Sequence, residues 1–230
     1  MRKLGLIGGM SWVSTRTYYE HLNRIVQGRR GGLASAPLLI ESHDFSDLAR
    51  LSDDAEWDRA AGTLADSARR LEAAGAGALV ITANSMHRVY DEVAAAVTIP
   101  ILHIADAVGE RMAAKRVKTA ALLGTSAVMT EGFYRQRLIG HGVTLLPPDM
   151  DGIAEIERLI YDDLMREKAS RAAERACKPW ITHQQQDGAK AIVLACTELE
   201  MVVDVDANVL PIYDGTRIHA EAAADWLLGE

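Results

Sequence analysis

The 230-residue chain has few of the groups that would commit it to a redox, metal or nucleic-acid role. It contains only two cysteines, Cys177 and Cys196, too few for a disulfide framework or a cysteine-based zinc site. It has no basic excess, because 25 lysines and arginines face 32 aspartates and glutamates and leave a net charge of −7. This balance argues against nucleic acid as a partner, which requires a concentrated basic surface.

Long hydrophobic runs are also missing. No apolar stretch approaches the ~20 residues needed to span a bilayer, so we expect no membrane partner. The opening residues, Met1 to Gly5, lead at once into a strand-like run without the apolar segment of a signal peptide. With reduced cysteines as the default, the sequence predicts a cytoplasmic protein. The 49% hydrophobic and 25% charged residues are typical of a globular domain.

Two apolar stretches, one in each half of the chain, have the same form. Lys190–Glu198 ends on a cysteine, a threonine and a glutamate, and Gly77–His87 passes through an alanine, an asparagine and a serine. When the two are superposed, Ala83 aligns with Cys196. A second pair of stretches aligns Gly8 with Gly124 at nearly the same offset, which indicates an internal repeat.

Strand-like runs alternate with helical patterns along the whole chain, which predicts an α/β fold built on parallel sheets. Together with the repeat, this gives two pseudo-symmetric, doubly wound halves. We place the N-terminal half at 1–114 and the C-terminal half at 115–215. The C-terminal helix, about 216–230, is expected to pack back on the first half.

Several predicted strands end in small polar residues, at the edge where open parallel sheets bind ligands. Backbone N–H groups there could hold a carboxylate, and hydroxyl and amide side chains could add donors: Ser11, Asn84, Ser85, Thr125 and Thr197. The alternative is that these residues only cap helices.

Cys196 is the candidate catalytic group, whereas Cys177 falls in a helical pattern typical of a packed cysteine. A cysteine between a strand and a helix N-terminus is expected to have a lowered pKa. It could act as a nucleophile or as an acid/base toward carbon. A nucleophilic cysteine needs a positioned histidine, and four are possible on sequence alone: His43, His87, His103 and His219.

Short segments throughout the chain resemble the aspartate/glutamate racemase superfamily, most closely its broad-specificity amino-acid racemase branch. The segments that carry the resemblance are Ile7–Trp12, Ser14-Thr15, Tyr18-Tyr19, Asn84–His87, Leu102–Asp106, Leu122–Thr125, Ala195–Glu198 and Ile218–Glu221. The resemblance implies two α/β halves with the active site between them, no cofactor or metal, and a homodimer. It also implies an amino-acid substrate, with aspartate or glutamate expected.

The family mechanism passes a proton between two cysteines and the α-carbon of an amino acid. By this resemblance Cys196 is the second cysteine, while Met10, Ser11, Asn84, Ser85, Thr125 and Thr197 would hold the substrate. Glu198 would orient or polarise the thiol. His43, Arg166 and Lys168 are candidates for binding a side-chain carboxylate, although a solvated charged surface is the alternative for them.

The first cysteine of the mechanism should stand immediately before Asn84, where this chain has Ala83. Alanine cannot move a proton, although some close relatives have threonine there. The chain is then an inactivated racemase, a one-sided natural variant, or an enzyme that uses a single cysteine, as arylmalonate decarboxylases do. A maleate-isomerase-like enzyme and a non-catalytic binder of acidic amino acids are further alternatives.

Overall fold

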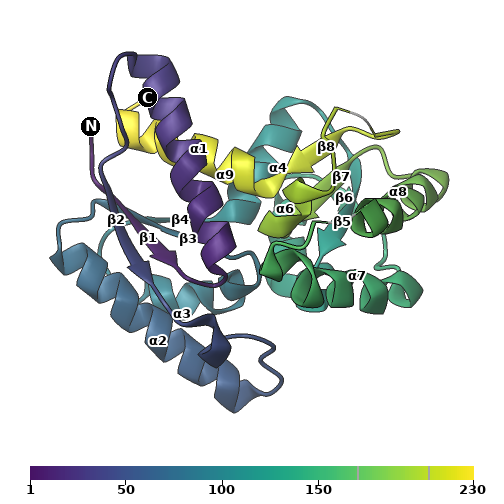
Figure 1. The fold of residues 1–230 in the computed structure, drawn as a ribbon, viewed down its shortest axis with the longest axis horizontal. Coiled ribbons are helices and arrows are strands. Elements are labelled where there is room, and N and C mark those ends of the chain that lie inside the picture. The colour runs from purple at the N-terminus through teal and green to yellow at the C-terminus, as the bar shows by residue number, and fades with distance from the viewer. Residues whose placement is uncertain (170, 207) are drawn as a thin grey trace. The chain divides into compact units, whose positions relative to one another are not determined.

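The computed structural model describes residues 1–169, 171–206 and 208–230. Its strands form two parallel four-stranded sheets, in the order β2-β1-β3-β4 and β6-β5-β7-β8. Both sheets therefore have the same connectivity, and helices flank each of them (Figure 1). The predicted α/β class with two repeated parallel-sheet halves is confirmed.

The first sheet is covered by helices on both faces. Its elements are β1 (Leu4–Gly8), α1 (Trp12–Arg30), β2 (Leu38–Ser42), the 3-10 turn η1 (Phe45–Asp47), α2 (Asp54–Ala73), β3 (Ala78–Ile81), the 3-10 turn η2 (Ser85–Val89), α3 (Tyr90–Ala94) and β4 (Ile101–Leu102). Leu4 and Leu6 pack with α1 and with the C-terminal helix α9 (Gly215–Leu228), whereas Ile7 packs with α2. Alternate side chains of β1 thus enter opposite layers, as strand geometry requires.

The second sheet has a single continuous core. Its elements are α4 (Ile104–Ala114), β5 (Thr119–Gly124), α5 (Ser126–Thr130), α6 (Gly132–Gly140), β6 (Thr144–Leu145), α7 (Met150–Asp162), the 3-10 turn η3 (Leu164–Arg166), α8 (Arg171–Gln186), β7 (Ile192–Ala195), the 3-10 turn η4 (Thr197–Met201) and β8 (Ile212–Asp214). All four residues of β7 are buried, as expected for a central strand covered on both faces. The helical periodicity of residues 169–186 predicts a helix there, and the structure has α8 from Arg171 to Gln186, while residue 170 lies outside the described residues.

The strand registers support the internal repeat residue by residue. Ile7 and Leu123 each precede the glycine that ends the first strand of their sheet. Ile7 pairs with Ile81 of β3, and Leu123 pairs with Leu194 of β7. Positions 83 and 196, each two residues further along, are therefore equivalent, as the superposed sequences predict.

The chain divides into two compact units, residues 1–103 with 219–230 and residues 104–218. The sequence-based boundaries, after 114 and after 215, differ from these. The main reason is α4, which buries Ile104 and Met112 in the core of the second unit. From His219 onward the chain belongs to the first unit, where Ala220 and Leu227 of α9 are buried. No helix among the described residues is long and apolar enough to cross a membrane.

Candidate active site

The chain leaves β1 through Gly9, which has a φ of 85°. Only glycine adopts this conformation without strain. Gly9 also lies so close to the backbone of His43 that there is no room for a side chain. A Cβ at this position would lie 2.2 Å from the backbone nitrogen of His43. The residues that follow, Met10 and Ser11, are buried. The Ser11 Oγ accepts a hydrogen bond from Ser14 N–H at 3.4 Å and caps α1, so this hydroxyl has the structural role that the sequence left open.

In the first unit, the side-chain amide of Asn84 is a candidate group for binding a ligand. It follows Ala83 beyond the end of β3, and both residues are buried. Neither Oδ1 nor Nδ2 of Asn84 has a hydrogen-bond partner among the described residues. A buried amide without partners costs about 1–3 kcal/mol for each unmet group. Asn84 is therefore suited to receive a polar ligand, and the half-buried Ser85 beside it starts η2.

A histidine holds the backbone at the alanine position. The Nδ1 of His87 lies 2.9 Å from the carbonyl oxygen of Ala83. Because a carbonyl can only accept, Nδ1 carries the proton in this contact. The ring of His87 packs edge-on against that of His103 at 4.5 Å and lies 6.0 Å from that of His219. The three histidines are thus gathered within the first unit.

Thr125 occupies the corresponding edge of the second sheet. It follows Gly124 at the end of β5 and has extended backbone angles at the N-cap of α5. Its side chain makes no capping hydrogen bond, and its buried Oγ1 has no hydrogen-bond partner among the described residues. Gly124 permits this arrangement, because a Cβ there would lie 2.8 Å from the carbonyl oxygen of Ala195. Thr125 is therefore a second available donor.

Cys196 directly follows β7 and is the N-cap residue of the turn η4, with extended backbone angles. Its side chain is buried, as are those of Thr197 and Glu198. The Cys196 Sγ donates a hydrogen bond to Oε2 of Glu198 at 3.2 Å. The partner of this thiol is therefore the carboxylate two residues further on, as the expected role of Glu198 requires.

The electrostatics of Cys196 differ from the sequence-based expectation. Burial raises the pKa of the Cys196 thiol well above its ordinary value, and the charge of Glu198 raises it further. Backbone N–H groups of Glu198 and Leu199 lower this pKa, which is the strand-to-helix effect that the sequence predicts. They are outweighed by burial and by the neighbouring carboxylate. The prediction of a lowered pKa was wrong, and the resting group is a protonated thiol.

Cys177 has the packing role predicted for it. It lies in α8 and is buried in the second core, and burial raises its pKa to about 11. Both cysteines are free thiols. Among the described residues, no group of three or more histidine, cysteine, aspartate or glutamate side chains is placed to hold a metal ion.

Comparison with known proteins shows the family to which the chain belongs. The family model for Asp/Glu/Hydantoin racemases matches residues 7–223, and the chain belongs to this family. The curated broad-specificity amino-acid racemase RacX of Bacillus subtilis (strain 168) is 24% identical over 165 residues, which cover 71% of this chain and 70% of RacX.

Solved structures agree with this class. The crystal structure of a candidate Asp/Glu racemase from Yersinia pestis is 38% identical, with a TM-score of 0.90, and the match covers 99% of this chain and 100% of that protein's chain. An aspartate racemase homologue from Pyrococcus horikoshii OT3 is 27% identical with a TM-score of 0.86 and the same coverage. The family and the close structural neighbours are racemases, which supports the assignment of this chain to the isomerases.

The sequence did not predict the histidine cluster around Ala83. Tyr18 donates from its hydroxyl to Nδ1 of His219 at 2.8 Å, and His219 donates from Nε2 to the carbonyl of Leu102 at 3.0 Å. Burial lowers the pKa of His219 to about 4, so this ring is neutral at physiological pH. A histidine and a tyrosine 201 residues apart carry no local sequence signal. Only the return of α9 to the first unit brings them together.

Proposed function

We propose that the chain moves a proton at the α-carbon of an amino acid, with Cys196 as the acid/base. The observation that carries this proposal is the buried thiol of Cys196, which donates a hydrogen bond to Glu198. Cys196 is the residue that is equivalent to Ala83 in the repeat. Membership of the racemase family supports the same chemistry. Ala83 stands where the family mechanism has its other acid/base, so the proposed activity is one-sided.

The unpartnered groups suggest how a substrate is held. Asn84 and Thr125 offer an amide and a hydroxyl that lack partners among the described residues, and we propose that they bind the polar groups on the α-carbon. Met10, Ser11, Ser85 and Thr197 remain proposed binding residues. The hydroxyl of Ser11 also caps α1.

The raised pKa of Cys196 has a consequence for its role. A protonated thiol is a proton donor, and it becomes a base only when its pKa falls. The ammonium group of a bound amino acid would lower this pKa, because an opposite charge within about 4–6 Å favours the thiolate. Substrate binding would thus activate Cys196, while the ligand-free enzyme keeps an unreactive thiol.

The remaining features follow the family resemblance. We propose that the protein works without a cofactor, as a homodimer, in the cytoplasm. The free state of both cysteines is consistent with a reducing compartment. Aspartate or glutamate is the substrate that the resemblance favours.

Decarboxylation of a malonate-type acid is a second candidate function. It needs only a proton donor for the carbanion left after carbon dioxide departs, and the protonated thiol of Cys196 satisfies that need without a second thiol at the equivalent position, Ala83. A third possibility, binding of acidic amino acids without catalysis, is separated from both by the same experiment.

Proton NMR of the α-position in heavy water tests these functions. We expect exchange in one enantiomer of aspartate, glutamate or another amino acid, and its loss in Cys196→Ser, because a hydroxyl is a much poorer acid than a thiol. Cys177→Ala, at the other cysteine, is the control and should keep the exchange. Carbon dioxide release from malonates without exchange would support the decarboxylase, and binding without either would support the binder.

A further inference from the structure

The backbone of Asn84 makes the hydrogen bond that its side chain would normally make as a helix cap. Asn84 is the N-cap residue of η2, with helical backbone angles, and its side chain makes no capping bond. An asparagine at an N-cap usually accepts from the N–H two or three residues further on. In this 3-10 turn, that N–H belongs to His87 and donates to the backbone carbonyl of Asn84 at 3.2 Å. The side-chain amide is thus left without a partner among the described residues.

His87 fixes the backbone on both sides of the Asn84 α-carbon. Its Nδ1–H donates to the carbonyl oxygen of Ala83 at 2.9 Å, and this carbonyl shares a planar peptide group with the N–H of Asn84. Its backbone N–H holds the carbonyl of Asn84, which belongs to the next peptide group. Because these two planes set the φ and ψ angles of Asn84, they also set the direction of its Cα–Cβ bond. His87 therefore orients the amide through the backbone.

The ring of His87 is itself held by aromatic packing. It is buried, lies parallel to the ring of Tyr90 at 6.4 Å and packs edge-on against that of His103 at 4.5 Å. The hydroxyl of Tyr90 donates to the carbonyl oxygen of Ile101 in β4 at 3.0 Å. A side chain that is locked by its neighbours can hold a binding group in one orientation before the ligand arrives. This packing therefore joins the support of Asn84 to the first sheet.

We propose that His87 is a positioning residue, which holds Asn84 in the orientation that binds the polar groups on the α-carbon of the substrate. The inference rests on the proposed function and adds to it a residue that acts through Asn84. Preorganisation of this kind raises affinity, because the ligand does not have to order the group that it meets.

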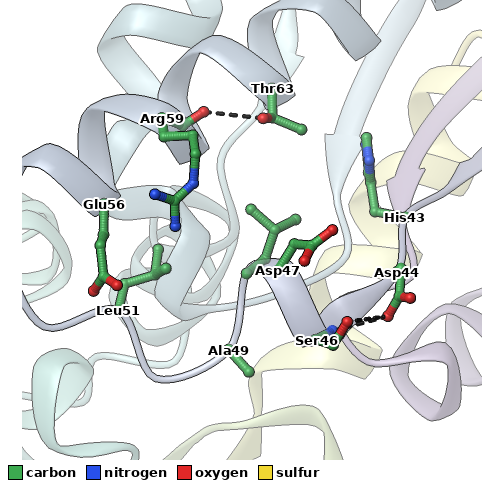
Figure 2. A pocket seen from close by; sticks show the side chains of 10 residues that line it. His43, Asp44, Ser46, Asp47, Ala49, Leu51, Glu56, Arg59 and Thr63 are labelled. Carbon is green, nitrogen blue, oxygen red and sulfur yellow. Dashed lines mark hydrogen bonds between the residues drawn. The ribbon is translucent and has the colours of Figure 1, made fainter.

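The role of His87 is separate from the pocket of about 470 Å³ in the same unit (Figure 2). That pocket lies between α2 and the segment after β2, and the side chains of His43, Asp47 and Arg59 help to line it. The described residues that line it include neither Asn84 nor His87. The half-buried His43 is thus a second histidine of the first unit whose ring lies outside the support of Asn84.

Replacement of His87 by leucine and by asparagine separates the hydrogen bond from the packing. Leucine has a similar size and no donor, whereas asparagine carries an N–H on the same branch of the side chain as Nδ1. The NMR order parameter of the Asn84 backbone N–H reports the motion of the peptide group that His87 holds. We expect about 0.85 in the parent protein and in His87→Asn, and below about 0.6 in His87→Leu. His43→Leu is the matched control and should leave this value unchanged.

The kinetic test follows α-proton exchange of aspartate and glutamate in heavy water. His87→Leu should raise KM about tenfold, as expected for the loss of one hydrogen bond, while kcat changes little because Cys196 belongs to the second unit. His87→Asn should keep the KM of the parent protein. When Asn84→Ala is already present, His87→Leu should cause no further rise, because a residue that acts through Asn84 then has nothing to position.

The two measurements separate this inference from the proposed function. An unchanged order parameter in His87→Leu, or additive effects of His87→Leu and Asn84→Ala, would overturn the role of His87 and leave the proposed function intact. If the parent protein neither exchanges nor binds aspartate and glutamate, the proposed function is rejected, while loss of order at Asn84 in His87→Leu still supports the positioning role.

Circular dichroism verifies that each variant is folded. Should His87→Leu fail to fold, His87→Gln takes its place with the same expected results. Glutamine keeps a polar group but moves the amide one carbon further from the backbone, away from the carbonyl of Ala83. An order parameter equal to that of the parent protein in His87→Gln would overturn the inference in the same way.

Discussion

At the scale of single residues, the proposed reaction has one acid/base group, Cys196, and the equivalent position in the other half of the repeat is Ala83. Cys196 retains its carboxylate partner in Glu198, and Asn84 retains an uncommitted amide. The methyl group of Ala83, by contrast, can neither donate nor accept a proton. Because Ala83 is buried and its carbonyl is fixed by His87, a side chain introduced there would be held in a defined place.

Ala83→Cys is therefore expected to restore transfer from the second side. The new thiol adds one buried sulfur, and the hydrogen bond from His87 uses the backbone rather than the side chain. Under the proposed function, racemisation should rise at least tenfold, measured as the approach of an optically pure amino acid to the racemate. Ala83→Ser tests whether any polar group suffices. A folded cysteine variant with no gain would show that this position takes no part in the reaction.

Glu198→Gln tests why the pKa of Cys196 is raised. The substitution removes a negative charge 3.2 Å from the sulfur and keeps an acceptor of similar shape. The pKa of Cys196 should fall, because burial then acts without the carboxylate. Alkylation by iodoacetamide at neutral pH should accelerate several-fold, with Cys177→Ala removing the background thiol. An unchanged or slower rate would show that Glu198 does not control ionisation.

At the scale of the elements, the sequence placed the strand ends well because their signals are local. Gly8, Gly124, Thr125 and Cys196 lie at the ends of buried apolar runs, and the structure puts each at a strand end. The sequence after Asn84 can start a helix, and the structure there has η2 followed by α3. The raised pKa of Cys196 could not be predicted from the sequence, because it depends on burial and on the position of the Glu198 carboxylate in the folded protein.

The C-terminal helix illustrates the same limit. The sequence predicts a helix over about 216–230, and the structure has α9 from Gly215 to Leu228. What the pattern cannot specify is its partner. The first unit buries Ala220 and Leu227 against Leu4 and Tyr18, so the last residues of the chain complete a core that begins with the first strand.

Leu227→Ala should for this reason destabilise the first unit. Leu227 is 0% exposed, and removing a buried leucine side chain typically costs about 2–5 kcal/mol. Leu33→Ala is the matched control, because Leu33 is 99% exposed and surface changes usually stay within about 0.5 kcal/mol. Urea unfolding followed by circular dichroism measures both. Equal small effects would show that α9 does not contribute to the core.

At the scale of the whole molecule, the repeat explains why the two sheets agree and where they have diverged. Both have the same strand order, and positions 83 and 196 are equivalent in register. The repeat was detectable because the strand sequences remain alike. The divergence lies in the surroundings, since the first unit gathers histidines and tyrosines near position 83 while the second places a carboxylate beside position 196.

Within this histidine cluster, His219 is expected to make stability depend on pH. Burial lowers the pKa of His219 from 6.5 to about 4, and the hydrogen bond to Leu102 only partly opposes the shift. Between these two values the unfolded chain binds a proton that the folded protein does not. Stability is therefore fully present above about pH 6.5 and is lost as the pH falls toward 4. The difference between the two pKa values corresponds to roughly 3 kcal/mol.

His219→Gln should flatten this acid dependence. Glutamine can still donate to the carbonyl of Leu102 and accept from Tyr18, but it does not titrate. The free energy of unfolding, measured with urea at several pH values between 4 and 7, should change less with pH in the variant than in the parent protein. His183→Gln, at an exposed histidine of α8, should leave the slope unchanged. If the slope of His219→Gln equals that of the parent, the acid sensitivity arises from other groups and His219 is not buried as a neutral ring.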